Sequence, residues 1–202
     1  MMRALITAGV LAILWTPSLR AQAPAPPPGN SGAGLPQVYM PEQLNPVQKQ
    51  ARDAVALLRD SVSAAGGALA GLSADAPSTS LQVMESRAAT VVDRCEAAER
   101  QRTQSVKDLS TAPLTTPGEL KAQKDMLKQM DKLKKPLDQC LTTYQPLAQR
   151  GKGQEIRDYG PARAKPIIAG FQQFDQSLKA FATAMKIQFR PMITSAGKSP
   201  LD

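Results

Sequence analysis

The spacing of the apolar residues is the feature that most constrains how this chain can fold. From about residue 44 they recur at steps of three and four in four segments, which are separated by breaks containing proline or glycine. Such spacing puts apolar side chains on one stripe of an α-helix, and no alternating β-branched or aromatic run indicates a strand. Four amphipathic helices with short connections pack best as an antiparallel bundle. We therefore expect an all-α, antiparallel four-helix bundle over residues 44–195.

Two of the four segments open with strong helix-start signals. Asn45 is the predicted N-cap of the first, with Pro46 at the first helical position. Thr116 is the predicted N-cap of the third, followed by Pro117 and, three residues after the cap, by Glu119. The apolar stripe predicted for this third segment consists of Leu120, Leu127, Met130, Leu137, Leu141 and Tyr144.

The starts of the other two segments are signalled less sharply. The second is expected to begin at Ser78 or Thr79, after a proline-containing break. Residues 151–160 contain several glycines and charged residues and are predicted to form a loop. The fourth helix is then expected to begin at Pro161 or Pro166, because proline is favoured in the first helical turn.

The N-terminal region has the features of an export signal. Arg3 precedes an apolar run from Ala4 to Trp15, and a proline and small residues follow, so residues 1–21 are predicted to be a signal peptide. An uncleaved N-terminal anchor is the alternative. Residues 22–43 are rich in Ala, Pro and Gly and are predicted to be a flexible linker, and residues 196–202 a disordered tail. The expected location is periplasmic or secreted, or membrane-attached if the first segment is retained.

The chain contains no histidine, and this excludes several classes of site. Ser-His-Asp and Cys-His catalysis, His-ligated haem and His-containing zinc sites cannot be built from it. We expect no catalytic residues, no cofactor and no metal. The formal net charge of +8 favours an acidic protein, anionic lipid or lipopolysaccharide as partner. Nucleic acid is not expected, because the basic region has no interleaved aromatic residues for base stacking.

Cys95 and Cys140 are the only cysteines. An even cysteine count in an exported protein favours a disulfide. If residues 110 and 117 face each other across the turn between the second and third segments, the two cysteines are offset by about 12 Å along the helices, which is too far for a bond. A shift of a helix end would close this gap. Two small buried thiols are the alternative.

Five lysines recur at three- and four-residue spacing in the third segment. At ~100° per residue they fall within an arc of about 80°, opposite Leu127 and Met130. They are Lys121, Lys124, Lys128, Lys132 and Lys135, which we call the lysine ridge. The ridge is a candidate binding site for an anionic partner, although charge runs on helices are more often simply solvated.

Two short motifs carry a resemblance to a known family. Leu44-Asn45-Pro46-Val47-Gln48 and Leu141-Thr142-Thr143-Tyr144-Gln145 are similar to the Leu-Thr-x-x-Gln signature of the Spy/CpxP-like periplasmic stress chaperones. The resemblance implies a secreted, all-helical protein without enzymatic activity, with a role in envelope stress. In the first motif, Asn45 takes the place of Thr as a chemically equivalent N-cap.

These observations lead to two functional hypotheses. The first is a non-enzymatic exported helical protein that binds a protein or envelope partner through an apolar groove or the lysine ridge, with a chaperone-like role as its most specific form. The second is a structural accessory subunit of an envelope or membrane complex. An enzyme is disfavoured, because no convergent set of Asp, Glu, Lys or Tyr residues is visible in the sequence.

Overall fold

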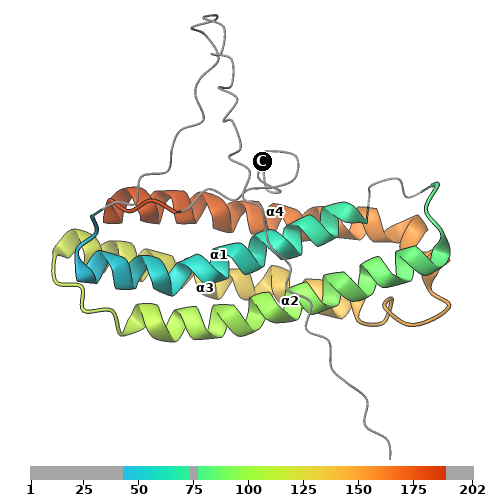
Figure 1. Cartoon of the computed structure of the whole chain (residues 1–202), viewed down its shortest axis with the longest axis horizontal. Coiled ribbons are helices and arrows are strands. Elements are labelled where there is room, and N and C mark those ends of the chain that lie inside the picture. Colours follow the sequence, from blue (N-terminus) through green and yellow to red (C-terminus); the bar gives the residue numbers. More distant parts are fainter. Residues whose placement is uncertain (1–42, 73–76, 190–202) are drawn as a thin grey trace, which may run out of the picture. The chain divides into compact units, whose positions relative to one another are not determined.

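The computed structural model describes residues 43–72 and 77–189, and these residues form four helices. The helices are α1 (Pro46–Gly71), α2 (Leu81–Ser110), α3 (Pro117–Tyr144) and α4 (Gly153–Met185). Figure 1 shows each helix running opposite to the one before it in the chain. α1 and α3 each pack against both α2 and α4, and α2 also contacts α4 across the bundle. The predicted all-α, antiparallel four-helix bundle is confirmed, and no strand occurs in the described ranges.

Local capping bonds set the starts of α1 and α3 as predicted. The Gln48 backbone N–H donates to Asn45 Oδ1 at 2.7 Å, and the Asn45 N–H donates to Gln48 Oε1 at 3.2 Å. Thr116 and Glu119 form the same reciprocal pair at α3, with bonds of 3.3 and 3.2 Å. α2 begins at Leu81, later than the expected Ser78 or Thr79, because Ser80 is the N-cap and its side chain accepts from the Val83 N–H.

The prediction for the start of α4 is wrong. The helix begins at Gly153, so most of the predicted 151–160 loop is helical, and Pro161 and Pro166 lie inside the helix. Two contacts from α2 fix this start. The Glu85 carboxylate accepts from the backbone N–H groups of Gly151 and Gly153 at 2.8 and 3.1 Å, and so provides the cap that Lys152 lacks.

Close packing holds the same helix end in place. A Cβ atom at Gly153 would collide with the Leu81 carbonyl oxygen, so only glycine lets the two helix starts lie together. The Arg157 guanidinium donates to the Thr79 carbonyl at 2.7 Å, and the Arg87 guanidinium donates to the Gly71 carbonyl at 2.9 Å. The starts of α2 and α4 and the end of α1 are therefore joined by side-chain-to-backbone bonds.

The bundle core consists of the apolar stripes of the four helices. In α3 the buried face is rotated from the predicted stripe. Leu120 is 45% exposed and Leu127 and Leu141 are only partly buried. The buried residues of α3 are instead Ala122, Met126, Met130, Leu133, Leu137, Cys140 and Tyr144. The prediction failed here because α3 has apolar residues on more than one face, and only contact with α2 and α4 decides which of them are buried.

Cys95 and Cys140 form a disulfide between α2 and α3, with their Cα atoms 6.4 Å apart. The offset of about 12 Å expected from a tight turn was wrong. The Gln123 side chain of α3 donates to the Leu109 carbonyl near the end of α2, so the first turns of α3 extend beyond that end. The connection therefore follows the direction of α2 before the chain reverses, with Ala112 and Leu114 buried along it. This shift brings the two cysteines level.

Within the described residues, no helix has both the length and the apolar character needed to cross a membrane. The predicted signal segment (1–21), all of the predicted linker except Gln43, and the predicted tail (196–202) lie outside the described residues.

Candidate functional site

The lysine ridge lies on the outer face of α3, and all five of its side chains are exposed. It lies opposite the helix face that carries Met126, Leu133 and Leu137. From Lys121 to Lys135 the ridge spans about 21 Å at the α-helical rise. Among the described residues, none of the five lysines forms an ion pair or a side-chain hydrogen bond. Their charges therefore face solvent without a fixed partner.

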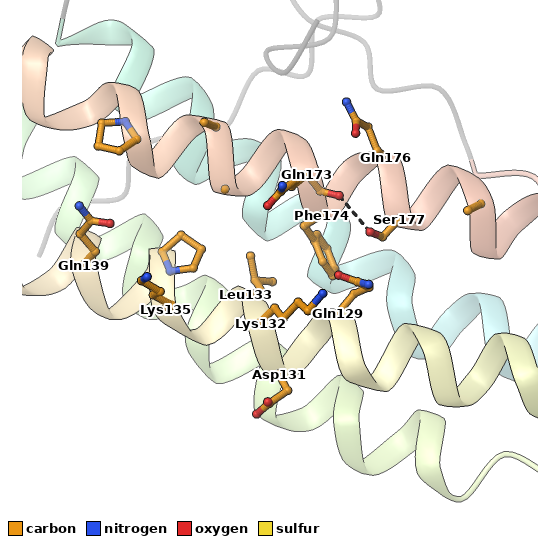
Figure 2. A pocket seen from close by; sticks show the side chains of 15 residues that line it. Gln129, Asp131, Lys132, Leu133, Lys135, Gln139, Gln173, Phe174, Gln176 and Ser177 are labelled. Carbon is orange, nitrogen blue, oxygen red and sulfur yellow. Dashed lines mark hydrogen bonds between the residues drawn. The ribbon is translucent and has the colours of Figure 1, made fainter.

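Two acidic residues of α3, Asp131 and Asp138, act electrostatically on α2. Arg102 of α2 holds Glu99 through two bonds of 2.7 and 2.5 Å. This hydrogen bonding raises the pKa of the Arg102 guanidinium, burial opposes the rise, and the charges of Asp131 and Asp138 on α3 add to it. Figure 2 shows the Asp131 side chain pointing away from α4. Asp131 and Asp138 are exposed, and their charges favour the charged form of Arg102.

A groove runs between α3 and α4 beside the ridge (Figure 2). It is open to solvent and has a volume of about 900 Å³. Leu133 and Phe174 lie between the two helices at its base, and Lys132 and Lys135 belong to both the groove and the lysine ridge. A smaller hollow of about 170 Å³ continues it past Gln129. We refer to both together as the α3–α4 groove.

The two walls of the groove differ in chemistry. Along α4 no charged side chain lines it, and this wall consists of Pro166, Ala169, Gly170, Gln173, Phe174, Gln176, Ser177, Ala180, Phe181 and Ala184. The α3 wall carries the two ridge lysines, the amides of Gln129 and Gln139, Asp131, and Asp125 in the smaller hollow. The groove therefore combines amide hydrogen-bonding groups and a small-residue surface with positive charge along one edge.

The sequence predicted the ridge but missed the groove residues Gln129, Gln139, Gln173 and Gln176. One signal was available in the sequence. Positions 166, 169, 173, 176, 180 and 184 follow helical spacing and carry no charge, which is unusual for the exposed face of a surface helix. Reading that signal required knowing that the fourth helix extends through this region and lies beside the lysine-bearing segment.

The other polar clusters are structural. Ion pairs lie along α2, where Arg100 is 3.7 Å from Glu96 and Arg102 contacts Glu99. Glu85, which the sequence did not single out, caps α4. In the part of the chain that the structure describes, no three potential His, Cys, Asp or Glu ligands come together.

The two family-like motifs have different geometry. In the first, Gln48 completes the capping box of α1, and its Nε2 also donates to the Met185 carbonyl at 3.0 Å, so this motif ties the start of α1 to the end of α4. In the second, Thr142 lies inside α3 and its hydroxyl donates to the Asp138 carbonyl at 2.8 Å. Only the first therefore acts as a helix start.

No protein-family model, curated protein or solved structure matches the chain.

Proposed function

We propose that this chain is a non-enzymatic, exported helical binding protein that holds an anionic partner of the cell envelope on the α3 side of its bundle. The observation that carries the proposal is the lysine ridge, with five exposed cations in a line and no ion-pair partner among the described residues. Aligned like charges without internal partners raise the local potential and attract an anion. The signal-like segment at residues 1–21 and the α2–α3 disulfide support export.

Charge, rather than apolar surface, is the better-supported basis for binding. The large apolar side chains exposed in the described ranges are few. They are Leu57, Leu81, Val83, Leu120 and Tyr159. A chaperone that captures unfolded chains through an apolar cradle would need a larger continuous patch. In its chaperone-like form the protein would therefore act on acidic clients, and as an accessory subunit it would use the ridge toward an acidic neighbour.

The test is a comparison of two charge-reversed variants with the same net charge. The ridge variant replaces three lysines that do not line the groove, Lys121→Glu, Lys124→Glu and Lys128→Glu. The control variant replaces exposed lysines on the other three helices, Lys49→Glu, Lys107→Glu and Lys165→Glu. Each tagged protein is incubated with envelope fractions of the cells from which the chain comes, and retained partners are identified by mass spectrometry.

We expect the amount of partner retained by the ridge variant to fall about tenfold or more, and the amount retained by the control variant to stay the same. The reason is that local potential rather than net charge guides association. Retention should also fall as salt rises. Equal retention by both variants, or equal loss, would show that the ridge has no specific role. A partner held in fixed stoichiometry would favour the accessory-subunit form.

A further inference from the structure

We propose that the α3–α4 groove is the binding site for an acidic amphipathic helix from a partner protein, with the lysine ridge pairing along one edge of that helix. This inference rests on the proposed function and names the class of its partner. It is carried by three properties of the groove: its shape, the small uncharged wall on α4, and the one-sided charge on α3.

The shape of the groove suits a rod. On α3 it extends from Ala122 to Gln139 and on α4 from Pro166 to Ala184, about 26 Å in each case at the α-helical rise. Because α3 and α4 are antiparallel neighbours, the hollow between them follows the length of the two helices. A helix of about 17 residues has the same length. A flat bilayer resting on the ridge would leave this groove unfilled.

The α4 wall allows a backbone to approach closely. Ala169, Ser177, Ala180 and Ala184 present short side chains to the groove, and the last two are exposed. The distance between packed helices falls as the side chains at their contact become smaller. Gln173 adds an amide that can bond with polar groups at the edge of a docked helix. This surface fits a partner stripe of alanine or leucine rather than a charged chain in an extended conformation.

The positive charge on the α3 edge favours a partner that carries negative charge. The ridge lysines recur at steps of three and four, which is also the period at which one flank of a docked helix presents its side chains. Glu or Asp residues on that flank would meet successive lysines, as flanking charges do in coiled coils. Asp125 is the one acidic residue in the narrow end, and Lys121 and Lys128 lie one turn away from it on either side. Asp131 also lines the groove, so two aspartates stand against the five ridge lysines and the net charge of the edge is positive.

The probe is a synthetic 18-residue peptide with leucine and alanine at helical spacing and glutamate along one flank. Its controls are the same peptide with lysine replacing glutamate, a scrambled peptide of equal composition, and vesicles of phosphatidylglycerol. Binding is measured by isothermal titration at low and moderate salt, and the gain of helix in the peptide by circular dichroism. We expect the acidic amphipathic peptide to bind, to become helical on binding, and to weaken as salt rises.

Two variants locate the bound peptide. Ala180→Trp fills the groove from an exposed position, and Lys132→Glu with Lys135→Glu reverses its charged edge. The matched controls are Ala64→Trp, on the exposed face of α1, and Lys49→Glu with Lys107→Glu. We expect a loss of about tenfold or more in affinity for both groove variants and little change for both controls. Unchanged melting temperatures would establish that the variants are folded.

The remaining outcomes would overturn either this inference or the proposed function on which it rests. Equal binding of the lysine peptide or the scrambled peptide would show that neither charge nor amphipathic shape is selected. Full binding of the acidic peptide by Ala180→Trp would show that the groove is not its binding site. The proposed function would still stand if the ridge variant lost its envelope partner. Binding of phosphatidylglycerol vesicles alone would assign the ridge to a lipid surface. In a last outcome, Ala180→Trp loses peptide binding, but the ridge variant retains its envelope partner as well as the wild type does. That outcome would instead overturn the proposed function.

Discussion

Tyr144 shows how a single side chain can join two helices at a place where prolines interrupt the backbone hydrogen bonding of one of them. It is fully buried, and its hydroxyl donates to the Gly160 carbonyl of α4 at 2.6 Å. That carbonyl immediately precedes Pro161, one of two prolines within α4. Because proline has no N–H to donate, α4 is short of backbone bonds in this region. The phenol thus adds a bond from α3 where α4 has fewer of its own.

We expect Tyr144→Phe to lower the free energy of unfolding by about 1–2 kcal/mol at neutral pH, since it removes the donor and keeps the buried ring. The measurement is urea denaturation of the two proteins. Exposed Tyr159, changed to Phe, is the control and should cost little. Equal stability of wild type and Tyr144→Phe would mean that the hydrogen bond contributes nothing.

The same residue predicts a pH dependence. Burial raises the pKa of the Tyr144 phenol to about 12, with a small opposing effect of Arg163. The unfolded chain, with an ordinary pKa near 10, loses this proton first, so the contribution is intact below pH ~10 and is lost as pH rises toward 12. Wild type should therefore lose stability faster than Tyr144→Phe over this range in urea denaturation. Parallel pH curves would contradict the assignment.

At the scale of helices, α3 and α4 approach each other closely at Pro136 and Gly170. A Cβ atom on Gly170 would lie 2.8 Å from the Pro136 Cβ and 3.0 Å from its Cγ. The proline ring is rigid, so an added methyl group cannot be accommodated by a simple side-chain rotation. The two helices would have to separate locally or α4 would have to shift.

We expect Gly170→Ala to be destabilising by about 1–3 kcal/mol through overpacking. Gly118→Ala is the matched control, because a Cβ there meets no atom within 4 Å. That change should instead stabilise by up to about 1 kcal/mol, through the better helix propensity of alanine. Thermal melts of the two variants should therefore move in opposite directions. A Gly170→Ala protein at least as stable as Gly118→Ala would rule out the close approach.

The sequence predicted those features of the helices that depend on near neighbours in the chain. The Asn45–Gln48 and Thr116–Glu119 caps are made within three residues, and both were found where expected. The start of α4 was missed because its cap is Glu85, a residue of α2. The cysteine register was missed for the same reason, since it depends on how the connection between α2 and α3 packs against the bundle.

The same difference between near neighbours in sequence and contacts between helices explains which part of the candidate site was predicted. The lysine ridge occupies one face of one helix, so its spacing alone placed Lys121 and Lys135 on the same side. The α3–α4 groove needs two helices at a particular rotation and separation. The rotation of α3 depended on the choice between its apolar faces, and the separation depends on the contact of Gly170 with Pro136. Neither quantity is encoded by residues close together in sequence.

At the scale of the whole bundle, the disulfide joins α2 to α3, the helix that carries the lysine ridge. Both cysteines are fully buried among the core residues, whereas the lysines of the ridge are exposed. The bond closes a loop with a sequence separation of 45 residues. Its main expected effect is therefore on the unfolded chain, whose freedom it restricts, rather than on the chemistry of the binding face.

The loop-closure entropy for this separation amounts to about 4 kcal/mol at 25 °C, and measured values for such bonds are commonly about 2–4 kcal/mol. We expect Cys95→Ala with Cys140→Ala to lower the free energy of unfolding by that amount, with a small further loss from the removed sulfur contacts. Urea denaturation of the wild type with and without reductant, beside the double variant, is the measurement. Reduced wild type and the variant should unfold at nearly the same lower midpoint, and the variant, while folded, should still bind through the ridge. If reduction left the midpoint unchanged, the bond would not stabilise the bundle; if it abolished binding under folding conditions, the disulfide would also be shaping the face that α3 presents.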